Sequence, residues 1–246
     1  LYYLTWRDIK IRYKQTILGA LWAIIQPVMT MVVFTIIFGN FAGIPSDGEN
    51  YAAFSFVALV PWTFFATALA RAATIMESSA EMIKKVYFPR IVLPTAGTLA
   101  PLVDFVLAFG VMLVLLVVFQ ATPTIGVLLL PFFLLLAVLT VLGLGYWLAA
   151  LNVLFRDVRF AVPFAVQMLL WVTPIAYPTS IIPERWLPLY MLNPMASVVD
   201  GFRWALLGTD TFPGSWLIVA TGVALVLFIS GAFFFRRMEK IFADVV

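Results

Sequence analysis

The chain has neither cysteine nor histidine among its 246 residues, and only 11% of them are charged. The lack of cysteine excludes disulfides, thiolate nucleophiles and Cys-based metal sites. The lack of histidine removes the commonest metal ligand and the usual proton relay. The sequence also contains no G-x-x-x-x-G-K-[ST] phosphate loop, no zinc signature and no G-x-S-x-G motif. We therefore predict no enzyme, no metal site and no ATP hydrolysis by this chain.

What the chain has in excess is apolar surface, with 64% hydrophobic residues and a mean hydropathy of +1.07. A soluble domain is about 45–50% apolar and about 25% charged. An excess this large must face lipid. A membrane span needs about 20 mostly apolar residues, and the uncharged stretches reach that length. We predict an all-α integral membrane protein with a single transmembrane domain over residues 1–246.

Six spans are predicted, at residues 17–39, 51–72, 91–119, 126–153, 161–178 and 214–235. The fifth is short, and Pro163, Pro174 and Pro178 interrupt or end it. The segment 179–212 mixes prolines with apolar residues and is predicted as short re-entrant helices on the outer side. Such backbone is tolerated at membrane depth only where protein or water shields it.

The basic residues predict the orientation, because cytoplasmic loops carry an excess of Lys and Arg. Of the 15 Lys and Arg residues, 13 fall on one side of the predicted spans, and only Arg185 and Arg203 fall on the other. The first side is predicted to be cytoplasmic, with both termini on it. We expect a membrane protein with several spans.

The N-terminal residues 1–16 predict an amphipathic interfacial helix. Its apolar residues recur every three or four positions and its cations form an opposite stripe that includes Arg7 and Lys10. Two interpretations stay open. The stripe anchors the helix to anionic lipid headgroups, or its cations meet a phosphate-bearing substrate.

The loop 73–90 predicts a short cytoplasmic helix in which Glu81 and Lys85 are spaced for an i,i+4 pair, with Glu77 one turn earlier. It is either a solvated connector or a docking element for a cytoplasmic partner.

Asp104 is the only acid well inside a predicted span. An intramembrane acid is a functional hypothesis by default, here for proton coupling. The favoured alternative is a structural brace, because Pro94 and Pro101 leave backbone groups unpaired nearby.

Aromatic residues make up 16% of the chain. Several do not lie at expected span ends and are candidates for a carbohydrate path, although packing or lipid contact is the commoner role of each. The candidates are Trp22, Trp62, Phe65, Phe164, Trp171 and Tyr177.

Four segments together resemble one family. They are the run Arg12 to Trp22 with Ile25-Gln-Pro27, the run Val86-Tyr-Phe-Pro-Arg90 with Leu93-Pro94, Phe155-Arg-Asp-Val-Arg159, and Leu192-Asn-Pro-Met195 with the run Gly201 to Leu207. In this order they resemble ABC-2 type permeases, and most of all the exporters of O-antigen, capsule and teichoic acid.

The resemblance implies a homodimer of this chain with two copies of a separate ATPase subunit, which holds the ATP and Mg²⁺. It implies that segment 73–90 docks on the ATPase, with Glu77, Glu81, Lys84, Lys85 and Arg90 as candidate contacts. It also implies that Arg7, Lys10 and Arg12 meet a lipid-linked diphosphate, and that the chain lies in a bacterial cytoplasmic (inner) membrane. Channel aromatics would include Trp62, Phe65, Phe164, Trp171 and Tyr177, and the substrate would be a lipid-linked polysaccharide.

Three alternatives remain. The nearest is an ABC-2 exporter of a small lipophilic compound or drug. An ion-coupled carrier with Asp104 as coupling site would usually show more intramembrane charge and internal repeats. A membrane enzyme acting on lipid-linked sugars would need paired acids at one interface, whereas the outer acids are scattered.

Overall fold

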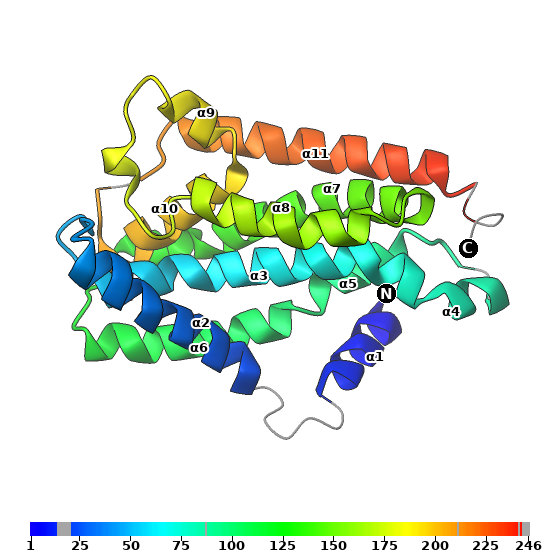
Figure 1. The fold of residues 1–246 in the computed structure, drawn as a ribbon, viewed down its shortest axis with the longest axis horizontal. Helices are drawn as coiled ribbons and strands as arrows, with labels where there is room; N and C mark the ends of the chain where they lie inside the picture. Colours follow the sequence, from blue (N-terminus) through cyan, green and yellow to red (C-terminus); the bar gives the residue numbers. More distant parts are fainter. Residues whose placement is uncertain (14–20, 87, 211, 241, 243–246) are drawn as a thin grey trace.

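The computed structural model describes residues 1–13, 21–86, 88–210, 212–240 and 242, with no account of the side chains of residues 11–13. Within these residues every regular element is a helix (Figure 1). The α-helices are α1 Tyr2–Tyr13, α2 Trp22–Phe34, α3 Tyr51–Ser78, α4 Ala80–Lys85, α5 Val92–Leu99, α6 Leu102–Val118, α7 Leu130–Leu154, α8 Val158–Val172, α9 Leu187–Met191, α10 Pro194–Leu207 and α11 Trp216–Met238. A π-helix, η2 Thr35–Phe41, continues α2, and η3 Ile125–Leu129 and η4 Thr179–Ile181 are 3₁₀-helices.

Five helical segments of the described chain are long and apolar enough to cross a membrane. They coincide with the first, second, third, fourth and sixth predicted spans, at Trp22–Phe41, Tyr51–Ser78, Val92–Val118, Ile125–Leu154 and Trp216–Met238. The predicted fifth span holds only the 15-residue α8. At about 1.5 Å per residue α8 is shorter than the roughly 30 Å hydrocarbon core. The all-helical class is confirmed for the described residues, and the sixth crossing stays a prediction.

Helix α3 is the centre of the bundle. It packs against α2, α5, α6, α7, α8 and α10, and 78% of its most apolar stretch is buried in the protein. The corresponding fraction is 17% for both the first and the last candidate span. Those two spans therefore present most of their apolar surface outward, as expected of helices that contact lipid.

Local chemistry sets several of the helix ends. The Asn50 side chain accepts a hydrogen bond from the backbone N–H of Ala52 and so caps α3. Asn193 caps α10 in the same way, with Pro194 at the first helical position. Gly208 ends α10 in the left-handed conformation, at φ 76°.

Two predicted segments are each divided between two helices. The predicted third span, residues 91–119, consists of α5 and α6, which are separated at Ala100 and Pro101. Proline supplies no N–H to the helix, so the ladder breaks there. The short helix predicted within segment 73–90 is α4, which begins at Ala80 and is separate from α3, because α3 continues through Ser78 and includes Glu77.

Helices α7 and α11 pack closely because glycines face each other between them. A Cβ atom at Gly143 would lie within 2.6 Å of the backbone of Leu227 and Phe228, and one at Gly231 would collide with the carbonyl oxygen of Gly143. Small residues at a helix crossing are a common basis of association in membranes.

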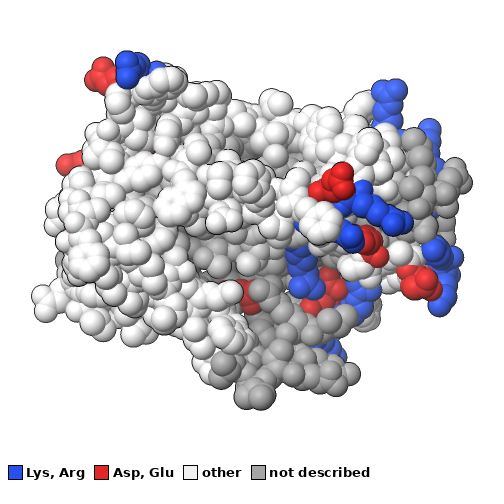
Figure 2. Space-filling model, viewed as in Figure 1, with Lys and Arg blue, Asp and Glu red and all other residues white. Residues whose placement is uncertain are grey.

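The two ends of the bundle differ in content. The N-terminus and the end of α11 lie at one end with α1 and α4, whereas α9 and the loop before α3 lie at the other (Figure 1). On the face shown in Figure 2, most charged side chains gather at the end that carries α1 and α4. This end is called the charged end below.

Candidate functional site

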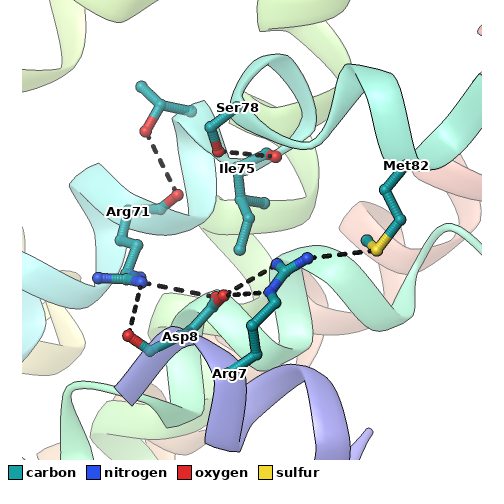
Figure 3. Close-up of polar contacts among 7 residues, drawn as sticks. Arg7, Asp8, Arg71, Ile75, Ser78 and Met82 are labelled. Carbon is teal, nitrogen blue, oxygen red and sulfur yellow. Dashed lines mark hydrogen bonds and ion pairs between the residues drawn. The ribbon is translucent and has the colours of Figure 1, made fainter. Parts of the chain in front are cut away.

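Helix α1 is attached to the bundle through a buried carboxylate. Asp8 is 4% exposed, and its side chain pairs with the guanidinium of Arg7 at 2.9 Å and with that of Arg71, on α3, at 3.6 Å. Arg71 also approaches the backbone oxygen of Asp8 at 3.4 Å (Figure 3). One acid thus gathers two cations from different helices.

A second contact ties α1 to α4. The other guanidinium nitrogen of Arg7 donates to the sulfur of Met82 at 3.2 Å (Figure 3). Leu4, one turn before Asp8, packs in the same apolar cluster as Met82. Helix α1 therefore contacts both α3 and α4. A displacement of α4 would change the position of α1.

The predicted headgroup cations are only partly brought together. The Arg7 side chain is 36% exposed and already engaged by Asp8. Lys10 is exposed and lies over the ring of Trp6, 5.6 Å from its centroid. The side chain of Arg12 lies outside the described part of the chain. Tyr2 and Trp6 point away from the bundle, at 72% and 47% exposure.

The predicted coupling residues fall into three groups. Glu77, at the end of α3, pairs with Arg159 of α8 at 3.0 Å. On α4, Glu81 and Lys85 form the expected i,i+4 pair at 3.4 Å, and Lys84 is exposed beside them.

Arg90 faces the end of α11. Its backbone N–H donates to the Glu239 carboxylate at 2.8 Å, and its guanidinium donates to the Glu239 backbone oxygen at 3.0 Å. The loop after α4 is therefore fastened to the last helix rather than to the ion pairs of α4.

A cleft of about 430 Å³ lies between α3 and α8 at the charged end. Arg71 and Arg159 contribute its cations, and Thr67 and Thr74 contribute hydroxyl groups. Both hydroxyls already donate to carbonyls of their own helix, so they present acceptor lone pairs to the cleft. The cleft adjoins the Asp8 junction through Arg71.

Asp104 lies in the first turn of α6 and is 9% exposed. It lines a small cavity of about 20 Å³ together with Gln26 of α2 and Thr63 and Thr67 of α3. A cavity of this size has room for about one water molecule. Asp104 therefore lies at a polar place between α2, α3 and α6, and both interpretations of its role stay predictions.

The five candidate channel aromatics do not share one surface. Trp62 and Phe65 are buried in α3, with ring centroids 5.2 Å apart. On α8, Phe164 is 64% exposed and Trp171 is 46% exposed. The hydroxyl of Tyr177 donates to the backbone oxygen of Trp171 at 2.7 Å. This bond satisfies a carbonyl in the last turn of α8.

The largest fully buried side chain among the described residues is charged and was not predicted to be buried. Arg203 of α10, predicted as one of two cations on the outer side, is 0% exposed. Its guanidinium donates to the carbonyls of Phe54, Pro174 and Ile175 at 3.3, 2.6 and 2.7 Å. It also lies 3.5 Å from the centroid of the Phe54 ring.

Asp200, one turn before Arg203, completes this buried cluster. Its carboxylate lies 3.9 Å from the Arg203 guanidinium and accepts from the Thr179 hydroxyl at 2.7 Å. The i,i+3 spacing of these residues was the only signal in the sequence. No group of three or more potential metal ligands occurs among the described residues.

The chain belongs to the ABC-2 type transporter family, which it matches over residues 1–207. Among curated proteins it is 32% identical to the O-antigen export system permease protein RfbA of Myxococcus xanthus, over 98% of this chain and 92% of that one. It is 28% identical to RfbA of Klebsiella pneumoniae, over 99% and 93% of the two chains. It is 23% identical to the polysialic acid transport protein KpsM of Escherichia coli, over 95% and 91%. The family predicted from the four sequence motifs is thus confirmed.

Proposed function

We propose that this chain is the membrane subunit of an ATP-driven exporter that moves a lipid-linked polysaccharide across the cytoplasmic membrane. The observation that carries the proposal is similarity along nearly the whole length to permeases named for O-antigen export. A polysialic acid transport protein, also matched end to end, extends the likeness to a second polysaccharide.

In this proposal the chain supplies the path, and a separate ATPase supplies the energy. Two copies of the chain form a homodimer, and two ATPase subunits bind ATP and Mg²⁺. Helix α4 is the docking element, with Glu81, Lys84 and Lys85 on its exposed surface. The contact between Arg7 and Met82 supports this scheme, because it joins α4 directly to α1. A movement of α4 on the ATPase would therefore also move α1.

The charged end is proposed to face the cytoplasm, with both termini there. The crowding of Lys and Arg at this end supports that orientation. Helix α1 would then lie at the membrane surface, with its exposed aromatics in the headgroup region. Lys10, Arg7 and Arg12 would meet the diphosphate of the carrier lipid.

The opposite end is proposed to close the exit. Short helices η4, α9 and α10 occupy segment 179–212, and the Arg203 cluster fixes α10 against α3 and the end of α8. Exposed aromatics on α8, among them Phe164 and Trp171, are available to line a path in the dimer. Sugar rings bind well to such faces through apolar burial.

Deletion of the gene in its host tests the proposal. We expect the polymer to accumulate inside the cell, still attached to its lipid, and to disappear from the surface. Complementation with the wild-type gene should restore surface polymer. Unchanged surface polymer in the deletion, together with sensitivity to small amphiphiles, would instead favour an ABC-2 exporter of lipophilic compounds.

A further inference from the structure

A basic cleft at the charged end is separate from the Asp8 junction and from the cleft between α3 and α8. It has a volume of about 730 Å³ and lies between α4, the following loop and the last turns of α11. Apolar side chains of the loop, Val86 and Phe88, form part of its wall. Its cations come from segments about 150 residues apart in the sequence, and they are Lys84, Lys85, Arg90, Arg236 and Lys240.

The charge in this cleft is not balanced among the residues that the structure describes. Glu239, the one acid among the described lining residues, is already engaged by Arg90. Lys85 pairs with Glu81 at 3.4 Å. Within the part of the chain that the structure describes, Lys84, Arg236 and Lys240 form no ion pair. The described residues of the cleft therefore present surplus positive charge to an anion that reaches them.

The position of these cations along the helices matches the phosphate level of a bilayer. Arg236 directly follows the uncharged stretch 211–235, and Arg90 comes two residues before the apolar helix that begins at Val92. Cations at the ends of apolar spans lie at the headgroup level. An anion bound here would therefore lie at the membrane surface.

The same face of α11 offers a track for an acyl chain. Ile229 and Phe233 precede Arg236 by seven and three residues, so the three share one helix face. They are 64% and 71% exposed respectively. A cationic cleft directly above a strip of exposed apolar side chains matches a phospholipid, which has a charged headgroup and apolar tails.

We propose that this cleft binds an anionic phospholipid of the leaflet that it faces. The phosphate lies among Arg90, Arg236 and Lys240, and an acyl chain lies along Ile229 and Phe233. Basic pockets between membrane helices on the cytoplasmic side are typical sites for such headgroups. The bound lipid would join the loop after α4 to α11. The proposal does not depend on which polymer is exported.

The test is native mass spectrometry of the full chain, purified with its ATPase subunit in detergent and titrated with phosphatidylglycerol or phosphatidylcholine. We expect the wild type to retain phosphatidylglycerol in preference. The double variant Arg236→Gln/Lys240→Gln should bind it roughly 30-fold more weakly. The matched control Arg156→Gln/Arg237→Gln, which removes two exposed cations outside the cleft, should bind it like the wild type.

Three outcomes of the lipid titration would overturn the proposal, and a fourth comes from a phosphate competition. One is equal retention of the two lipids by the wild type. Another is equal loss of binding in both double variants, since that would show a general surface attraction. The third is loss of the ATPase subunit from the cleft variant with phosphatidylglycerol binding intact, which would make the cleft a protein contact. Inorganic phosphate added at the same concentration should not displace the lipid; displacement would show that a free anion is the ligand.

Discussion

The two ends of the bundle hold their charges in opposite ways. At the charged end, the pairs Glu77–Arg159 and Glu81–Lys85 have side chains between 42% and 80% exposed. At the other end, Asp200 and Arg203 are 2% and 0% exposed. Exposed pairs contribute about 0–1 kcal/mol, whereas removing one partner of a buried pair costs about 3–5 kcal/mol. The charged end can therefore rearrange at low cost, while the other end keeps its shape.

The largest effect on stability is expected from substitution of Arg203. Arg203→Met leaves Asp200 buried without its cation and three carbonyls without their donor, so unfolding should become easier by about 3–5 kcal/mol. Thermal unfolding in detergent measures this. Arg185→Met, at the same end but exposed, is the control and should unfold like the wild type. If Arg203→Met unfolds at the same temperature as the wild type, the end that holds Arg203 is not stabilised by this buried pair.

Asp8 is the exception that sharpens the comparison, because it is a buried charge at the charged end. Asp8→Asn weakens the contacts to Arg7 and Arg71, and hydrogen bonds to charged groups contribute about 1.5–3 kcal/mol. We expect faster hydrogen exchange in α1 with little change in global unfolding. Lys10→Gln, on the same helix, should leave exchange unchanged. Equal protection of α1 in Asp8→Asn and wild type would show that Asp8 does not attach it.

Between the two ends, α7 and α11 pack closely at their glycines. Gly231→Ala should destabilise the protein by about 1–3 kcal/mol, because the added methyl group meets the Gly143 carbonyl and forces the helices apart. Gly222→Ala, on the same helix, meets nothing within 4 Å and should be neutral or slightly stabilising. Thermal unfolding of the two variants tests this. Similar unfolding midpoints would contradict the close packing of α7 and α11 at Gly231.

Glu81 should show the smallest effect on stability and a clear effect on assembly. Glu81→Lys removes an exposed pair, so unfolding should change by less than about 1 kcal/mol. Co-purification of the ATPase subunit should nevertheless fall if α4 is the docking element. Glu184→Lys, exposed at the opposite end, should co-purify normally. Full recovery of the ATPase with Glu81→Lys would refute the docking role.

The sequence predicted those features that depend on local pattern. Uncharged runs located the five long apolar helices, and the i,i+4 spacing predicted the Glu81–Lys85 pair. The break between α5 and α6 was missed because hydropathy continues across Pro101 while the hydrogen-bond ladder does not.

The contacts that unite distant segments were not predictable in this way. Asp8 meets Arg71 and Arg90 meets Glu239 only because the helices pack together. Arg203 was counted among the outer-side cations because it falls in segment 179–212, outside the predicted spans. In the fold, carbonyls freed at the end of α8 surround it.

The most direct test of the export proposal is the ATPase activity of the reconstituted complex of this chain and its ATPase subunit. It is measured with and without a polyprenyl-diphosphate-linked glycan. We predict that the glycan lipid stimulates hydrolysis, and that the polyprenyl diphosphate without the glycan stimulates it less. An ATPase activity that does not change with the glycan lipid but rises with small amphiphiles would contradict the export of a lipid-linked polysaccharide.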